Sequence, residues 1–238
     1  MACTLQQGNI ECNLNGRHKR RAPAACALVW WWDGTRKEND RQQRIQSVAK
    51  KGKGRLKAME WLEQVQARYK RKNQILFTKQ SDCLLELRGL LEKADHRVAV
   101  LWAFALAEET VTQFSQRYPN ELRPGQVLSA ARLWAEGKIK MPAARPAILA
   151  CHAAAKDMAL PQDAARCHAV GQACSVVHTA GHALGFPLYD LTAVVLQCGV
   201  EHCAQAVLDR TQEYVNVLLR CMGDSTLEQG EWAAFLRR

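Results

Sequence analysis

The densest set of potentially reactive side chains lies between Cys167 and His182, in the segment CHAVGQACSVVHTAGH. If this segment is one continuous helix, Cys174, His178 and His182 lie one turn apart along a single face. Two histidines at this spacing can share a metal ion, with bonds of ~2.0–2.1 Å for zinc. At ~1.5 Å of rise per residue the cysteine is too far from the second histidine to join them, so a complete site needs ligands from elsewhere. The candidates for these ligands are His152, His202 and Cys203.

The metal hypothesis that follows uses His152, His178 and His182, with zinc as the metal. Thr179 stands where the HExxH motif has its glutamate, which excludes a zincin mechanism. No carboxylate in the segment is placed to orient a ligating histidine. The competing interpretation, in which these side chains simply pack between helices and bond to the backbone, is therefore favoured.

A nucleophilic pair is a second chemical hypothesis, for example Cys151 or Cys174 with His178. No glycine-rich turn that could form an oxyanion hole accompanies either cysteine. The chain also has no P-loop, GxSxG or GxGxxG motif, so nucleotide-binding and α/β-hydrolase functions have no support. We therefore expect no catalytic residues and a protein that is not an enzyme.

The ten cysteines point to a reducing compartment. No two have the CxxC spacing of zinc ribbons and thioredoxin-like proteins. Several lie in Ala- and Val-rich segments, where a free cysteine behaves as a small buried apolar residue. No apolar run approaches the ~20 residues that cross a bilayer. We expect a soluble cytoplasmic protein with free thiols.

The positive charge is concentrated at one end of the chain. The first 94 residues contain 20 Lys and Arg against 9 Asp and Glu, whereas the rest contain 13 against 14. We expect a basic extension at 1–75, disordered or partly helical, and a helical domain at 81–238. A basic arm could bind nucleic acid, but charge alone is weak evidence for it. The interpretation of 1–58 as lying upstream of a start at Met59 also stays open.

Apolar spacing predicts the elements that position these residues. Residues 1–40 have no sustained period and are expected to be irregular, and apolar residues between 56 and 69 fit an amphipathic helix. Beyond Ser81 no strand-like alternation occurs, and Pro and Gly separate the helical segments. The predicted helices are 81–93, 95–118, 124–137, 141–158, 161–182, 188–198, 200–222 and a short one within 231–236. This pattern predicts an all-α fold, an antiparallel multi-helix bundle.

Two sets of residues in this bundle suggest a surface and a core. Trp102 and Trp134 lie on the apolar faces of their helices and are expected to anchor the core. The loop between the second and third of these helices contains Tyr118, Asn120 and Arg123. Because loops on rigid scaffolds often carry binding residues, these three are the predicted partner-binding residues.

Residues 95–195 also resemble a bacterial helical family of immunity proteins, the immunity-family-five-like domain. The most specific matching pieces are Arg123-Pro124 followed by AARLW at 130–134, GKI at 137–139, HAA at 152–154, and GQA at 171–173 with His178 and His182. The resemblance extends to the leading helix from Ser81. It does not cover 1–75, and the extra cysteines after Cys198 depart from it.

The resemblance implies an all-α protein that binds and neutralises a cognate bacterial toxin by occlusion, without catalysis. It brings no catalytic residues with it. Two alternatives stay open: a metal-binding or hydrolytic helical protein that uses the Cys/His segment, and a nucleic-acid-binding accessory protein that uses the basic arm. The oligomeric state has no signal in the sequence.

Overall fold

The structure is a computed structural model that describes residues 3–6, 9–12, 54–224 and 230–237, with side chains described from Glu60 onward. The chain forms two compact units, Met1–Gly52 and Lys53–Arg238, each of which is considered by itself. In the first unit, strand β1 (Cys3–Gln6) pairs in antiparallel fashion with β2 (Asn9–Cys12). This hairpin differs from the irregular structure expected there, because four-residue strands are too short to show a period. The remainder of the expected irregular stretch lies outside the described residues.

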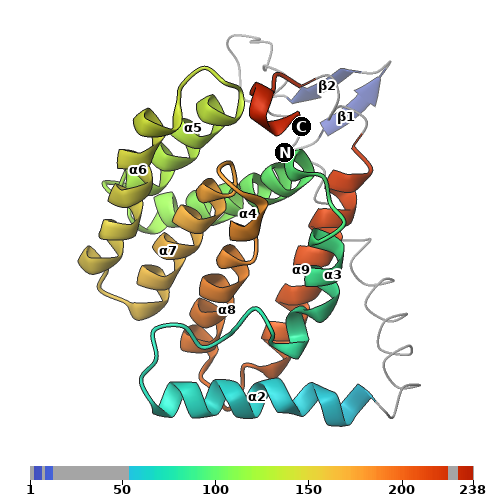
Figure 1. Cartoon of the computed structure of the whole chain (residues 1–238), viewed down its shortest axis with the longest axis vertical. Helices are drawn as coiled ribbons and strands as arrows, with labels where there is room; N and C mark the ends of the chain where they lie inside the picture. The colour runs from blue at the N-terminus through green and yellow to red at the C-terminus, as the bar shows by residue number, and fades with distance from the viewer. Residues whose placement is uncertain (1–2, 7–8, 13–53, 225–229, 238) are drawn as a thin grey trace. The chain divides into compact units, whose positions relative to one another are not determined.

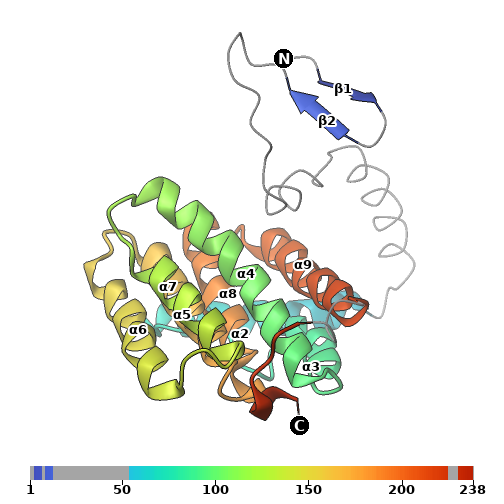
Figure 2. The same ribbon diagram turned by 90° about the horizontal axis from the view of Figure 1, so that it is seen from above.

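The second unit is an all-α antiparallel bundle, as the sequence predicts (Figure 1). Its α-helices are α2 (Gly54–Lys70), α3 (Leu85–Leu91), α4 (His96–Arg117), α5 (Arg123–Ala135), α6 (Met141–Ala154), α7 (Pro161–Ser175), α8 (Gly185–Cys198) and α9 (Ala204–Met222). The described part of this unit also contains the short 3-10 helices η2 (Asp82–Leu84), η3 (Ala155–Asp157), η4 (Ala180–His182) and η6 (Ala234–Leu236). Helices α5, α6 and α7 lie on one side of α4, and α3 and α9 lie on the other (Figure 2).

Local signals explain where several helices begin. The Asp95 side chain accepts a hydrogen bond from the Arg97 backbone N–H and caps α4. A proline lies in the first turn of α5, α6 and α7. Backbone N–H groups in a first turn have no partner within the helix, so the N–H that proline lacks costs no hydrogen bond there. Ser81, where the first helix was predicted to begin, does not cap a helix with its side chain: its hydroxyl accepts from the Thr78 N–H at 3.0 Å. The chain therefore enters α3 through the 3-10 turn η2.

The compact unit begins earlier than the expected boundary at Ser81. Helix α2 confirms the helical spacing predicted between 56 and 69, and its Trp61 stacks on Phe77 with ring centroids 5.9 Å apart. Both rings are buried in the main core, together with Leu76. The Leu76 N–H also donates to the Thr192 hydroxyl of α8 at 3.0 Å. Helix α2 belongs to the bundle because it contributes Trp61 and Val65 to this core.

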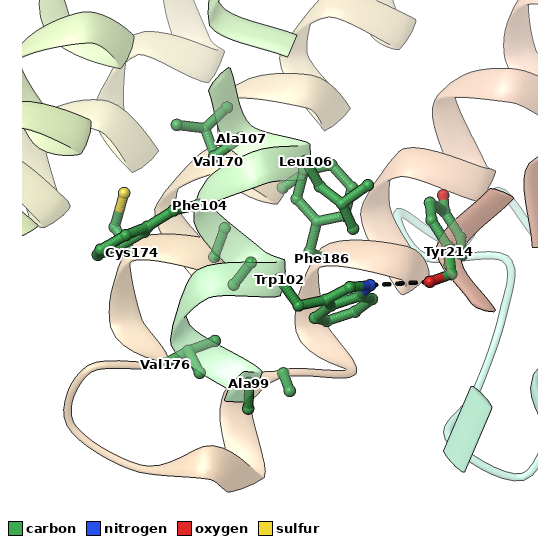
Figure 3. Packing of buried hydrophobic residues seen from close by; sticks show 14 of the residues in the cluster. Ala99, Trp102, Phe104, Leu106, Ala107, Val170, Cys174, Val176, Phe186 and Tyr214 are labelled. Carbon is green, nitrogen blue, oxygen red and sulfur yellow. Dashed lines mark hydrogen bonds between the residues drawn. The ribbon is translucent and has the colours of Figure 1, made fainter. Parts of the chain in front are cut away.

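The centre of the bundle surrounds Trp102 of α4, which is fully buried as predicted (Figure 3). Its indole N–H donates to the Tyr214 carbonyl of α9 at 2.9 Å. The Tyr214 ring also meets the Trp102 and Phe186 rings edge to face, a favourable geometry for aromatic pairs. These contacts fix the positions of α4, α8 and α9 relative to one another.

A buried polar network reinforces the same three helices. The Asp190 carboxylate of α8 accepts from the Tyr214 hydroxyl at 2.6 Å and from Arg210 Nε at 2.8 Å. Arg210 also pairs with Glu109 of α4 and with Glu213. Burial alone would lower the pKa of Arg210, but the surrounding carboxylates outweigh it and raise that pKa. The polar groups of this network are thus paired with one another.

Candidate functional site

Tyr118, the first of the predicted partner-binding residues, is tied to the bundle. Its hydroxyl donates to the Asp163 carboxylate of α7 at 2.7 Å, and its ring packs on Phe114 with centroids 4.8 Å apart. Arg117 also donates to Asp163, at 2.9 Å. Burial alone would raise the pKa of Asp163, but these hydrogen bonds outweigh it and lower that pKa. Tyr118 therefore positions the loop, and its hydroxyl is already engaged.

Arg123 is engaged in the same way at the other end of the loop. Its Nε donates to Glu121 at 2.7 Å, and its Nη2 donates to Asp157 at 2.7 Å. The hydrogen bonds that it donates to the Glu121 and Asp157 carboxylates raise the pKa of its guanidinium. Asn120 is exposed. The structure brings the three predicted residues into one loop, and Asn120 has the least engaged side chain of the three.

The predicted face with Cys174, His178 and His182 is interrupted because α7 ends at Ser175 rather than continuing to about residue 182. The Val176 carbonyl lies 2.6 Å from His96 Nε2 of α4, and the Val176 side chain is buried. The Val176 carbonyl therefore faces the His96 ring and not a backbone N–H further along a continued helix. His178 then lies exposed beyond α7, and His182 ends the 3-10 helix η4.

His152 pairs with a residue that the sequence reasoning did not select. Its Nδ1 lies 3.0 Å from Nδ1 of His168 on α7, and the His168 ring packs against Tyr189 of α8 at 5.0 Å. Burial, together with the neighbouring His168, lowers the pKa of His152, and burial lowers that of His168. The two rings therefore share one hydrogen bond in their neutral forms. No sequence spacing signals this pair, because the residues lie on different helices.

The metal hypothesis gains no additional ligand from this geometry. Among the residues that the structure describes, no group of three or more His, Cys, Asp and Glu side chains could hold a metal ion. The His152–His168 pair offers two nitrogens, whereas a structural zinc site takes four ligands and a catalytic one takes three. His178 lies instead against the Trp134 ring, with centroids 6.3 Å apart.

The cysteines considered as nucleophiles are buried. Cys151 donates to the Cys167 carbonyl at 3.3 Å, and burial raises the pKa of each of these thiols to about 12. Burial also raises the pKa of Cys174. Because the thiolate is the nucleophilic form, these three thiols are unreactive at neutral pH. All three side chains are part of the apolar clusters inside the bundle.

A pocket of about 500 Å³ opens where α5 turns into α6. Trp134 forms part of its wall and is only 4 % exposed, with the rings of His178 and Phe235 each 6.3 Å from its own. Lys140 and Met141, at the start of α6, line the same pocket. The pocket thus combines aromatic and aliphatic walls with one cationic side chain.

Gly137 produces the turn that shapes this pocket. Its φ of +77° is costly for other residues. Its N–H donates to the Trp134 carbonyl and the Lys138 N–H donates to the Leu133 carbonyl, which together form a Schellman motif. A Cβ at Gly137 would also lie 3.3 Å from Cα of Ala233. Because Gly137 has no side chain, a second segment of the chain can pack against the turn at the end of α5.

That second segment is the C-terminal tail, residues 230–237. The Ala233 N–H donates to the Ala135 carbonyl at 2.7 Å, and Leu236 is buried to 1 % exposure. Lys138 pairs with Glu231 at 3.1 Å. The tail, which the sequence predicted only as a short helix, supplies one wall of the pocket through Ala233, Ala234 and Phe235.

Comparison with known proteins gives one result. The sequence profile of a family described as "Imm-5 like putative immunity protein" matches residues 89–217, more than half of the chain. The matched region contains the pocket residues from α5, α6 and the segment after α7, and it ends before the tail. No curated protein and no solved structure matches the chain. Within the described residues, no helix combines the length and apolarity needed to cross a membrane.

Proposed function

Since the chain belongs to the Imm-5 like family of immunity proteins, we propose that it binds a cognate bacterial protein toxin and neutralises it by occlusion. The observation that carries this proposal is the match over residues 89–217, which spans most of the bundle from α4 to α9. Occlusion requires a rigid surface rather than a reactive group. The paired polar network and filled core of this bundle are suited to that role.

The proposal includes no catalytic step. The buried thiols of Cys151, Cys167 and Cys174 are protonated at neutral pH, and activation of a nucleophile needs the opposite shift. The proposal places the protein in the cytoplasm, where such thiols stay reduced. It requires neither a bound metal nor nucleic acid for toxin binding.

For the contact surface, the loop with Tyr118, Asn120 and Arg123 remains a proposal. Asn120 is its exposed position, while Tyr118 and Arg123 would act by holding the loop in shape. This division of roles predicts that Asn120→Ala changes toxin affinity without changing stability. It also predicts that Tyr118→Phe, which removes the hydrogen bond to Asp163, changes stability first.

Co-expression tests the proposed function directly. A protein that is encoded next to this gene and kills cells when produced alone is produced in cells with and without the present chain, and survival is counted. Survival only with the chain, together with a stable complex in a pull-down, is the expected result. Absence of both the complex and the protection would contradict the proposal. Protection without a complex would point to an enzymatic or indirect mechanism instead.

A further inference from the structure

The pocket at the α5–α6 turn has a positively charged side chain in its lining and no negatively charged one among the described residues. Lys140 is the charged residue in its lining, and among the described residues its ammonium group has no ion-pair partner. The nearby carboxylates of Glu136 and Glu231 are both bound to Lys138, at 2.8 and 3.1 Å. No acidic side chain lines the pocket in the part of the chain that the structure describes. The pocket is therefore complementary to an anionic group.

The same pocket leaves large apolar side chains partly in water. Phe235 and Met141 are each 41 % exposed. Phe235 meets Trp134, whose other neighbour in the pocket is His178. A volume of about 500 Å³ lies within the usual range of ligand pockets and can accommodate a large side chain. Aromatic residues grouped in this way are typical of the energetically dominant positions of protein interfaces.

The tail does not fill this pocket, because its own apolar anchor points elsewhere. Leu236 is buried in the main core, and the Ala233 N–H is bound to α5. The tail thus forms a fixed wall beside the pocket. The basic first part of the chain is also a poor occupant, since its charge has the same sign as Lys140.

We propose that this pocket is the anchor site for the toxin, and that it receives an aromatic or large aliphatic toxin side chain flanked by a carboxylate. The apolar side chain would lie against Trp134 and Phe235, and the carboxylate would pair with Lys140. This inference rests on the proposed function, which it deepens by adding an anchor point at the end of α5 opposite the loop with Asn120 and by naming the chemistry of the partner.

The test uses the full chain and the protein encoded by the adjacent toxin gene, with affinity measured by calorimetry. Lys140→Glu reverses the charge and should weaken binding by about tenfold or more, because it sets two like charges against each other. Lys140→Met keeps the aliphatic stem and should give a smaller loss. Phe235→Ala removes a partly exposed wall residue and should also weaken binding by about tenfold.

Matched controls lie outside the pocket lining. Lys93→Glu changes the same charge at an exposed position after α3, and Leu149→Ala truncates a side chain on α6 that is 54 % exposed. Each should alter affinity by less than about twofold. Thermal unfolding of every variant establishes that a loss of binding is not a loss of folding.

The outcomes separate the two levels of the proposal. If the unmodified chain binds the toxin and the variants Lys140→Glu and Phe235→Ala bind it equally well, the anchor site is refuted and the proposed function stands. If the unmodified chain neither binds nor protects, the proposed function fails as well. A toxin variant with a surface carboxylate changed to lysine that restores binding to Lys140→Glu would identify the paired residue.

Binding of an RNA or a second copy of this chain in place of the toxin would overturn the proposal.

Discussion

The centre of the bundle and the edge formed by α5, α6 and the tail differ in how their aromatic and polar groups are paired. At the centre, the Trp102 indole, the Tyr214 hydroxyl and the Asp190 carboxylate each have a partner within the fold. At the edge, Phe235 is 41 % exposed, and Lys140 has no ion-pair partner among the described residues. Substitutions at the centre should therefore change stability, and substitutions at the edge should change binding.

The strongest test of this difference is Trp102→Ala. Loss of the buried indole should lower the free energy of unfolding by about 4 kcal/mol, because a large cavity remains. Urea unfolding followed by circular dichroism measures the change. Phe235→Ala is the comparison at the edge and should cost about 1 kcal/mol or less, since that ring is already partly in water. Equal losses for the two variants would contradict the proposed division between centre and edge.

The next largest effect is expected for Asp190→Ala. This change removes the acceptor of the Tyr214 hydroxyl and the most buried of the three carboxylates that pair with Arg210, which should cost about 3 kcal/mol in unfolding free energy. The control is Glu108→Ala, which breaks an exposed ion pair with Arg132 and should cost less than about 0.5 kcal/mol. A loss as small as the control's would show that the central network adds little to stability.

A smaller effect should follow from Gly171→Ala on α7. A Cβ there would lie 2.7 Å from the His152 ring, and this overpacking should cost about 1–3 kcal/mol. Gly89→Ala on α3 is the matched control, since nothing lies within 4 Å of its added Cβ. It should be neutral or stabilising because alanine favours helices. In the double variant with His152→Ala, the Gly171→Ala penalty should largely disappear, and a penalty that persists would show that the ring is not the obstacle.

The smallest effect concerns pH and the His152–His168 pair. Burial lowers both pKa values in the folded state relative to about 6.5 in the unfolded chain. The stability contribution of the neutral pair is fully present above pH ~6.5 and is lost as the pH falls below it. Urea unfolding between about pH 5 and 7.5 should show this decline. The slope should be smaller in a variant with both histidines changed to glutamine, and an unchanged slope would assign the effect to other groups.

Local sequence signals predicted much of the bundle. Asp95 caps α4, and Gly137 closes α5, because capping and left-handed turns depend on a few adjacent residues. Burial of Trp102 followed from helical spacing. The predicted start of the helix at residue 188 was wrong by a few residues: α8 begins at Gly185, and Pro187 fits within its first turn.

The candidate site was harder to predict because distant segments form it. The pairing of His152 with His168 and the contact of the tail with α5 both depend on tertiary packing, which no local spacing encodes. The end of α7 at Ser175 likewise depends on His96 of α4, next to the Val176 carbonyl. Trp134 was predicted as a core residue, and its burial confirms this. That Trp134 also lines a pocket could not be predicted from the spacing of its own helix, because the other walls come from distant segments.

The contact between the Ala233 N–H and the Ala135 carbonyl also sets an order of events during synthesis. Helices α5 and α6 can associate as soon as both have left the ribosome, since their contacts are close in sequence. The pocket wall formed by Ala233 and Phe235 is added only after α7, α8 and α9 have been made. A nascent chain therefore carries most of the bundle before it carries a complete pocket, so the proposed anchor site is completed only after residue 235 has left the ribosome.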